Sequence, residues 1–307
     1  MHRMPIPLAR TLWLVAGFSL TASASTFTQI DYPGSILTNL YGLNDSNMAV
    51  GLYIDSALTA HGFEYNTGTY MTLDVPGADA TQAIGINDAG LVVGGYGQAG
   101  VAHGFLLVGG TYMTIDVPGA AGTVAQGINV SGLIVGSYSD AGGFEHGFTD
   151  LAGVFMNIDF PGAPETQVNG VNGAGLIVGS YTDAGGVEHG FLDNGGVYTS
   201  IDYPGSVDTQ AIGINDAGLI VGSYVDSSLM THGLVDKGGS LSTKDYPGAS
   251  GTCACGVNNQ GYISGSFYDG TTDHGFIMTP EPATAMLAFP ALLGLGFLSR
   301  KRTRRTV

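Results

Sequence analysis

Apolar and β-branched residues along this chain fall into short runs that are separated by turn residues. The stretch 209–245 contains four such runs, at 209–215, 219–224, 232–236 and 241–245. Asp216-Ala217-Gly218 and the pair Gly238-Gly239 stand between runs and favour tight turns. Runs of this length are too brief for helices, and their branched residues suit a pleated strand. The stretch therefore predicts four short antiparallel strands.

The same pattern recurs six times with a nearly constant step. An Asp-x-Pro-Gly turn, a His-Gly pair and a Gly-x-Asn triplet each repeat every 42 or 43 residues. A period of this size is typical of one supersecondary unit repeated in an array, in which each unit buries its apolar face only against its neighbours. The markers are the aspartates Asp31, Asp74, Asp116, Asp159, Asp202 and Asp245, the histidines His61, His103, His146, His189, His232 and His274, and the asparagines Asn44, Asn87, Asn129, Asn172, Asn215 and Asn258.

Six units of four antiparallel strands predict an all-β fold, a six-bladed β-propeller over residues 26–278. The phase of the repeat is informative as well. The predicted domain begins with a fourth-strand sequence, residues 27–31, and ends with a third-strand sequence, residues 274–278. The N-terminal strand should therefore complete the last blade and close the ring, which hides the edges of the sheets. A β-solenoid is the alternative architecture, and it would not need complementary ends.

Residues 1–24 have the pattern of a secretory signal peptide. Arg3 and Arg10 supply its basic region, residues 11–20 form an apolar run, and Ala22-Ser23-Ala24 is a small-x-small cleavage site. The apolar run is too short to span a bilayer. A transit peptide or a retained anchor is the alternative. The segment predicts that the protein is exported.

Residues 279–307 combine three features in a fixed order. Pro280-Glu281-Pro282 is followed by an apolar stretch, 283–298, and then by the basic cluster 300–305. A plain C-terminal membrane anchor with a cytoplasmic basic end is one interpretation. The order resembles the PEP-CTERM sorting signal of Gram-negative bacteria. That resemblance implies an exosortase-type processing enzyme as a partner and a cell-surface or extracellular location. Contact with the membrane would be limited to a transient or retained transmembrane anchor formed by this segment.

The repeats resemble a second family pattern. Residues 86–90 read Ile-Asn-Asp-Ala-Gly, residues 92–94 read Val-Val-Gly, and residues 103–105 read His-Gly-Phe. This order is similar to the HAF family of extracellular repeats, although glycine replaces the family's alanine after each histidine. The resemblance implies a surface or extracellular protein and carries no activity that could be transferred to this chain.

The predicted propeller is strongly acidic. Residues 26–278 hold 24 of the 25 acidic residues and, as basic residues, only Lys237 and Lys244, which gives a charge of −22 (2 minus 24). Such a surface repels nucleic acid and anionic lipid and attracts cations. The loops that begin at Asp140 and Asp183 suggest at most a weak calcium site, because neither has the spacing of an EF-hand. No other cofactor is predicted.

The in-phase histidines and aspartates are the first candidates for chemistry. A single catalytic centre needs its ligands once, whereas these residues recur in every unit, so we expect them to build the repeat and no metal site is predicted. A metal or proton role for the histidines is the alternative. Cys253 and Cys255 lie two residues apart on one strand, a poor spacing for a disulfide. They are predicted to be separate thiols, with Cys255 a small core residue.

A specific site should lie where the repeats differ, and the loops between the second and third strands do so. These loops cover residues 54–60, 97–102, 139–145, 182–188, 225–231 and 268–273. Function often resides on loops over a rigid scaffold. The alternative is that their apolar side chains fold inward and cap the blades. The predicted binding-face residues are Leu58, Phe144, Glu145, Val187, Glu188, Leu229 and Met230.

The chain has no G-x-S-x-G nucleophile elbow and no zincin motif, so the sequence favours a protein without catalysis. We expect a binding or structural module of the cell surface or extracellular matrix. Its partner would be an exopolysaccharide, by analogy with the sorting system alone, or a surface protein. The alternative is an extracellular hydrolase or lyase that acts on polysaccharide. Nonrepeating carboxylates in the central channel would favour the enzyme, whereas repeated glycine and apolar residues would favour the scaffold.

Overall fold

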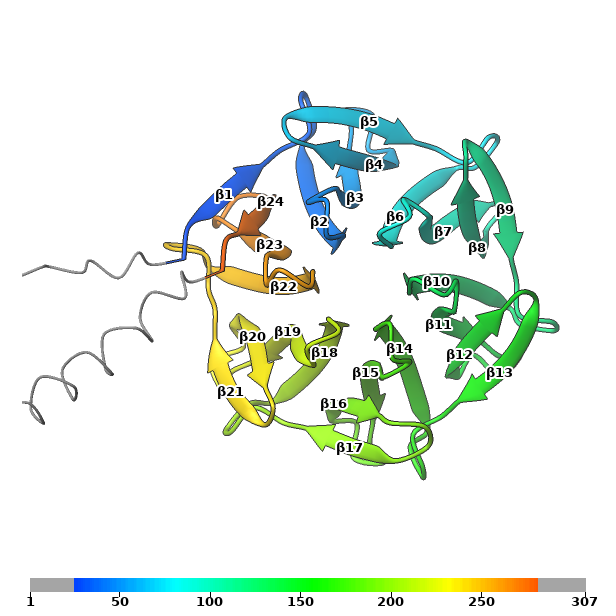
Figure 1. Ribbon diagram of the computed structural model, residues 1–307, viewed down its shortest axis with the longest axis vertical. Coiled ribbons are helices and arrows are strands. Elements are labelled where there is room, and N and C mark those ends of the chain that lie inside the picture. The colour runs from blue at the N-terminus through cyan, green and yellow to red at the C-terminus, as the bar shows by residue number, and fades with distance from the viewer. Residues whose placement is uncertain (1–24, 281–307) are drawn as a thin grey trace, which may run out of the picture. The chain divides into compact units, whose positions relative to one another are not determined.

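The computed structural model describes residues 25–280. The predicted signal peptide and most of the sorting segment, including Glu281 and Pro282, lie outside the described residues. Thr26–Pro280 forms one compact unit, in which the strands make six four-stranded antiparallel sheets. The sheets are arranged as blades around a common centre (Figure 1). The predicted six-bladed β-propeller is confirmed.

Each blade uses four consecutive strands, except the last, which takes its outer strand from the N-terminus. Blade 1 contains β2 (Leu37–Leu43), β3 (Ala49–Ile54), β4 (Ala60–Asn66) and β5 (Thr69–Leu73), and blade 2 contains β6 (Ala80–Ile86), β7 (Val92–Gln98), β8 (Val101–Val108) and β9 (Thr111–Ile115). Blade 3 contains β10 (Gly122–Ile128), β11 (Ile134–Ser139), β12 (Glu145–Leu151) and β13 (Val154–Ile158), and blade 4 contains β14 (Glu165–Val171), β15 (Ile177–Thr182), β16 (Glu188–Asp193) and β17 (Tyr198–Ile201). Blade 5 contains β18 (Asp208–Ile214), β19 (Leu219–Val225), β20 (Thr231–Lys237) and β21 (Ser240–Thr243), and blade 6 contains β22 (Gly251–Val257), β23 (Ile263–Tyr268), β24 (Asp273–Met278) and β1 (Phe27–Ile30).

The N-terminal strand closes the ring, as the phase of the repeat predicted. β1 pairs antiparallel with β24, in a register that sets Phe27 opposite Met278 and Ile30 opposite Gly275. Beyond the strands, the Thr279 amide donates to the Thr26 carbonyl oxygen over 2.9 Å. The alternative of an open solenoid is excluded.

The first strand of each blade lies innermost (Figure 1). The register between β6 and β7 shifts between Ala83 and Gly85, so that Ile84 has no partner on β7. β10, β14, β18 and β22 have the same bulge at the equivalent residue. Close strand packing also explains a repeated glycine, because a Cβ atom on Gly94 would lie 2.0 Å from the Gln82 carbonyl oxygen. Bulges of this kind re-aim a side chain, here beside the centre of the ring.

Two faces of the ring follow from the order of the strands. We call the face with the Asp-x-Pro-Gly turns and the pre-histidine loops the His face, and the face with the turns after the innermost strands the Asn face.

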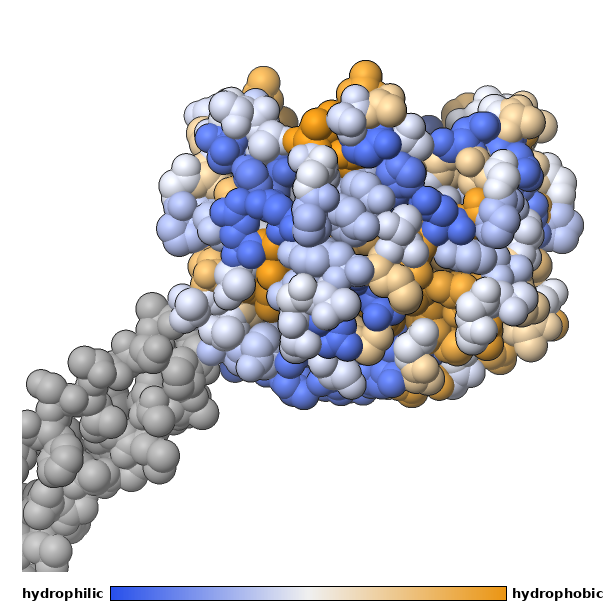
Figure 2. Space-filling model, turned by 90° about the horizontal axis from the view of Figure 1, so that it is seen from above, coloured by the Kyte–Doolittle hydropathy of each residue, from blue (hydrophilic) through white to orange (hydrophobic). Residues whose placement is uncertain are grey.

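Between blades the core is apolar: Val50 of blade 1, for example, packs with Ala83 and Phe105 of blade 2. The rim is mixed in polarity (Figure 2), and its outer strands expose Met71 and Met113.

The six marker asparagines form a closed ring of hydrogen bonds, which the sequence did not predict. The Nδ2 group of each donates to the main-chain oxygen of the equivalent asparagine in the next blade, as from Asn172 to Asn215 over 3.1 Å. The last link runs from Asn258 back to Asn44, also over 3.1 Å. The side chains are buried, so these bonds are shielded from water. The Gly-x-Asn marker therefore joins the blades to one another.

Candidate functional site

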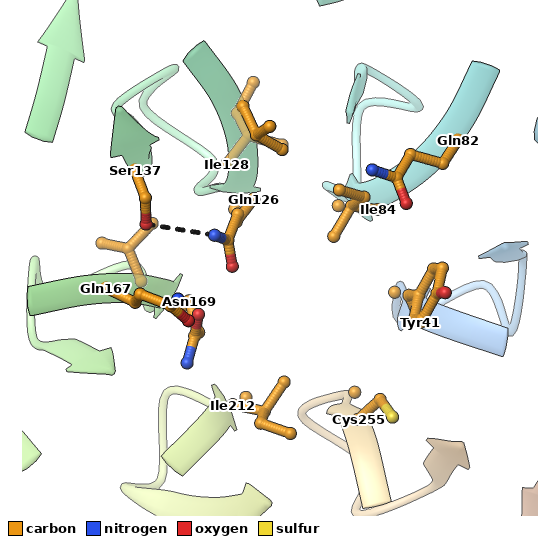
Figure 3. Close-up of a pocket in the computed structure, with 18 of the residues that line it drawn as sticks. Tyr41, Gln82, Ile84, Gln126, Ile128, Ser137, Gln167, Asn169, Ile212 and Cys255 are labelled. Atoms are coloured by element: carbon orange, nitrogen blue, oxygen red, sulfur yellow. Dashed lines mark hydrogen bonds between the residues drawn. The ribbon is translucent and has the colours of Figure 1, made fainter. Parts of the chain in front are cut away.

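A cavity of ≈ 580 Å³ lies at the centre of the ring, walled by the innermost strands (Figure 3). Side chains line it at three levels from the His face to the Asn face. The level nearest the Asn face is apolar in every blade, for example Ile86 and Ile128. The middle level consists of the bulge residues, and here the blades differ: the lining residues are Tyr41, Ile84, Gln126, Asn169, Ile212 and Cys255.

Amide side chains supply most of the polarity of this cavity. Gln126 donates from Nε2 to Ser137 Oγ over 3.1 Å, and Asn169 donates from Nδ2 to the Ala211 carbonyl oxygen over 3.0 Å. These bonds orient the two amides and leave their oxygens without a partner among the described residues. Gln82, in the level nearest the His face, makes no side-chain hydrogen bond within the described part of the chain. The cavity thus offers hydrogen-bonding groups that its own walls do not satisfy.

The cavity wall is almost free of charge. Glu145 is the one carboxylate in the lining, which contains no lysine, arginine or histidine among the residues described. The Gln167 Nε2 group donates to this carboxylate. Burial raises the pKa of the Tyr41 phenol, so the hydroxyl remains neutral at physiological pH. The wall is therefore suited to a neutral polar ligand.

The two cysteines are separate thiols, as predicted. Contact with the Cys253 thiol, together with burial, raises the pKa of Cys255 well above its ordinary value, which disfavours a reactive thiolate. Cys255 is buried, as predicted for a small core residue. Both cysteines also line the central cavity, which was not predicted. The strand alternation correctly placed both on one face, but it could not show which face points to the centre.

The marker histidines and aspartates bond to one another on the His face. His189 Nδ1 lies 2.7 Å from Asp202 Oδ1, and its Nε2 lies 3.6 Å from Asp183 Oδ2. The equivalent histidines of blades 1, 3, 5 and 6 also lie between two aspartates. In blade 2 the shorter loop has no such aspartate, and His103 faces Asp116 alone. In the other five blades these contacts join the loop to the Asp-x-Pro-Gly turn. The structural role of the marker residues stays a prediction.

Two carboxylates around one imidazole favour the imidazolium ion. The hydrogen bond to Asp202 raises the pKa of His189, and Asp245 does the same for His232. For His61 and His274 burial of the ring lowers the pKa, but the paired aspartates outweigh it and the net shift is upward. The loop aspartates shift in the opposite direction: backbone amides of their own loops, followed by the histidine, lower the pKa of Asp183 and its equivalents in blades 1, 3 and 5. In blade 6 the Thr271 hydroxyl is the largest cause, and it lowers the pKa of Asp269 together with the loop amides.

These shifts predict that the ring is more stable near pH 5.5 than near pH 8.5. A histidine pKa that is raised on folding adds stability below the unfolded value of about 6.5, and this stability is lost as the pH rises through the folded value. The lowered aspartate pKa values add stability above about pH 4, which is lost only in stronger acid. The melting temperature, measured by circular dichroism from about pH 4 to 9, should reach its maximum between these limits.

The double variant His189→Gln/His232→Gln separates this effect from general charge repulsion. The carboxylates remain ionised between about pH 8.5 and 5.5, so repulsion among them changes little in this window and acts on the variant and the wild type alike. The variant should therefore show a smaller rise of melting temperature between about pH 8.5 and 5.5. Identical slopes for the two proteins would contradict a role for the histidines.

The predicted binding-face loops lie on the His face and expose their apolar tips. Leu58 is 76% exposed, Leu229 77% and Phe144 52%, so these side chains do not cap the blades. Val187 and Met230 are also exposed. The two glutamates are turned to the neighbouring blade instead: Gln210 Nε2 donates to Glu188 Oε2 over 2.8 Å, in the way that Gln167 donates to Glu145. Binding by these loops stays a prediction.

The Asp-rich loops use their carboxylates internally. Asp140 Oδ1 accepts the amides of Gly142 and Phe144, while its Oδ2 faces His146. Across residues 25–280, no group of three or more His, Cys, Asp or Glu side chains is placed to hold a metal ion. The same residues include no helix with the length and apolarity of a membrane span.

Sequence reasoning missed the middle level of the cavity wall. The signal was present in the sequence. The residue just before the Gly-x-Asn triplet differs between blades and is Tyr, Ile, Gln, Asn, Ile and Cys in chain order. Half of these residues are apolar or thiol side chains that also suit a core. The loops between the second and third strands were predicted as the site instead, because they differ in length as well as in sequence.

No family model matches this chain, and no curated protein matches it. Solved structures share the fold at low identity. A mutant of the Aleuria aurantia lectin in complex with Fucα1-6GlcNAc is 11% identical, with a TM-score of 0.52, and the match covers 81% of this chain and 99% of the lectin. The SapL1 lectin in complex with α-methyl fucoside is 12% identical, with a TM-score of 0.53, over 77% and 90% of the two chains. A protein assigned as a gluconolactonase is 14% identical, with a TM-score of 0.53, over 84% and 93%. At these identities the likeness establishes the propeller fold alone.

Proposed function

We propose that this protein is a noncatalytic carbohydrate-binding module that takes a neutral sugar in its central cavity. The observation that carries the proposal is the amide-lined, nearly uncharged wall at the middle level. Sugar hydroxyls donate and accept hydrogen bonds, and the unpaired amide oxygens of Gln126 and Asn169 and the free amide of Gln82 complement them. Ile84 and Ile212 on the same wall offer apolar contact to the ring carbons.

The charge of the wall favours binding over hydrolysis. Glycosidases place two carboxyl groups on either side of the scissile bond, one as acid and the other as base or nucleophile. The described lining holds Glu145 alone, and Gln167 already bonds to it. An anionic sugar such as a uronate would meet the negative charge of the ring. A neutral sugar in a surface or extracellular polysaccharide is therefore the ligand class that the cavity fits best. The cell-surface setting rests on the terminal segments.

The lectin structures provide the first probes. Two solved propellers hold fucose-containing ligands, so α-methyl fucoside belongs in a panel with other neutral monosaccharides and a uronate. Titration calorimetry should detect a neutral sugar and not the uronate. Gln82→Leu removes an amide at nearly constant volume and should weaken binding by about 5- to 10-fold, the effect of one lost hydrogen bond.

Gln260→Leu is the matched control. Gln260 lies on the Asn face, where it donates to the Asp45 carbonyl oxygen, and it does not line the cavity. Its replacement should leave sugar affinity unchanged. Equal losses in both variants, or no binding of any neutral sugar, would refute the cavity as the site. Release of cleaved sugar from a polysaccharide, abolished by Glu145→Gln, would instead establish the hydrolase alternative.

A further inference from the structure

An aromatic ring fills the same slot in four of the six blades. The ring belongs to the residue after the aspartate of the Asp-x-Pro-Gly turn. Tyr32 stacks on Tyr53 of blade 1 at a centroid distance of 3.7 Å and meets Tyr70 of the outer strand edge-on at 5.5 Å. The equivalent rings of Phe160, Tyr203 and Tyr246 stack on Tyr181, Tyr224 and Phe267 at 3.6, 3.8 and 3.6 Å.

Blade 2 keeps the walls of this slot but lacks the ring. Val75 stands at the position of Tyr32, and a pocket of ≈ 400 Å³ opens beside it. The side chains that contact Tyr32 in blade 1 are Tyr53, Phe63, Tyr70 and Thr72. Their equivalents in blade 2 line the pocket and are the same residue types: Tyr96, Phe105, Tyr112 and Thr114.

The chemistry of the occupied slot shows what the open one would accept. In blade 1 the Tyr32 hydroxyl lies 2.7 Å from Thr72 Oγ1, so the slot holds the ring and the hydroxyl of a phenol together. In blade 2 the Tyr96 hydroxyl lies 2.9 Å from Thr114 Oγ1, which keeps the threonine at the equivalent place. Phe105 is fully buried and provides an apolar floor. Aromatic walls of this kind favour a stacked or edge-on ring.

We propose that the blade 2 slot, defined by Val75, Tyr96, Phe105, Tyr112 and Thr114, binds a para-substituted phenol from outside. The ring stacks on Tyr96, and the hydroxyl reaches Thr114. A free small phenol and the tyrosine side chain of a peptide present the same chemistry. The slot shares no lining residue with the central cavity, so the proposal does not depend on the sugar-binding function.

The test uses p-cresol, which is the side chain of tyrosine, as the probe in titration calorimetry. The wild-type protein should bind one equivalent. Val75→Tyr supplies the ring from within, so p-cresol binding should fall by more than tenfold. Filling the cavity should also raise the melting temperature by roughly 2–6 °C for a domain of this size. Undiminished binding by a folded Val75→Tyr protein, or no binding by the wild type, would overturn the proposal.

Three further variants locate the site. Val117→Tyr makes the same replacement in blade 3. There Asn157 stands in place of Thr114 and its Oδ1 accepts from the Tyr138 hydroxyl over 2.7 Å, so the threonine contact is missing and p-cresol binding should be unchanged. Tyr32→Val opens the matching slot in blade 1 and should add a second equivalent. If Val75→Tyr fails to fold, Thr114→Val tests the same contact on an exposed side chain: it should weaken p-cresol several-fold but leave toluene unaffected. Equal effects on both probes would argue against the hydroxyl contact.

The source of the phenol is tested with N-acetyl-tyrosinamide. Binding as tight as that of p-cresol means that the slot accepts a tyrosine within a peptide, and loss of binding restricts it to free phenols. Binding of α-methyl fucoside that Val75→Tyr abolishes, together with no binding of p-cresol, would show that the slot is a sugar site and would overturn the proposal.

Discussion

Removal of β1 is expected to abolish the folded ring. Deletion of residues 26–30 takes away the whole ladder with β24 and two apolar side chains. Ile30 is buried in the core beside Leu40, and Phe27 contacts the rings of Tyr246 and Phe276 at 5.3 and 5.4 Å. Burial of two such side chains contributes about 3–6 kcal/mol, which approaches the total stability of about 5–15 kcal/mol that domains have. Size-exclusion chromatography and circular dichroism should show aggregated or unfolded protein.

A circular permutant provides the matched control for this deletion. Thr26 and Thr279 are hydrogen-bonded, so a short linker can join the two ends of the ring. New chain termini are placed in the turn between β16 and β17. The N-terminal strand of the permutant is then β17, the outer strand of blade 4, just as β1 is the N-terminal outer strand of blade 6 in the wild type. This permutant keeps every strand and should melt close to the wild type. A deletion variant that melts like the wild type would show that closure by β1 contributes little.

Addition of the missing strand as a peptide makes the test sharper. A peptide of residues 25–34 offers the same backbone groups to β24 and should restore folded protein when it is present during refolding, since extended peptides add to exposed sheet edges. A peptide with Ile30 replaced by Asp should fail, because the side chain enters a buried position. Rescue by both peptides would indicate binding without the native register.

The number of blades and the closure of the ring could be predicted because both follow from counting along the chain. The Asp-x-Pro-Gly period gives six units, and the half-units at residues 27–31 and 274–278 are complementary. The ring of asparagines could not be predicted. Asn172 was visible as a marker, but its bond to Asn215 spans two blades and depends on how closely their innermost strands approach.

The site was predicted less well than the fold. Phe144 and Leu229 were placed correctly on exposed loops of the His face, because loop position follows from strand order. The cavity wall was missed because an innermost strand has two largely apolar sides. Alternation puts Gln82 and Ile84 on one side of β6, but it does not say whether that side meets the next blade or the centre. The bulge at Ile84 adds a change of direction that no residue pattern reveals.

The blade 2 slot was partly predictable, unlike the cavity wall. Val75 is readable in the sequence as the residue that replaces Tyr32, so the difference between repeats was available from the start. Its meaning depends on the walls that surround it. The positions of Tyr96 and Tyr112 show that a pocket opens beside Val75, at the place that the ring of Tyr32 fills in blade 1.

Replacement of a single asparagine of the hydrogen-bonded ring is expected to cause a large loss of stability. Asn172→Ala removes the donor to the Asn215 carbonyl oxygen and the acceptor that Ala174 and Leu176 share. Asn172 is buried, so water cannot replace these bonds, and each unsatisfied group costs about 1–3 kcal/mol. We expect a loss of about 3–5 kcal/mol in the free energy of unfolding, which corresponds to a melting temperature lowered by roughly 10 °C.

Asn172→Asp separates the link between blades from the local turn. An aspartate can still accept from Ala174 and Leu176, but its ionised carboxylate cannot donate to Asn215 and repels that carbonyl oxygen. The variant should therefore be destabilised near neutral pH, and it should recover stability relative to the wild type as the pH falls and the protonated carboxyl becomes a donor. Asn194→Ala, on an exposed turn of the same blade, is the control and should change stability by less than about 0.5 kcal/mol. If Asn172→Asp matches the wild type near pH 7, the asparagine serves its own turn alone and the hydrogen bonds around the ring add nothing to its stability.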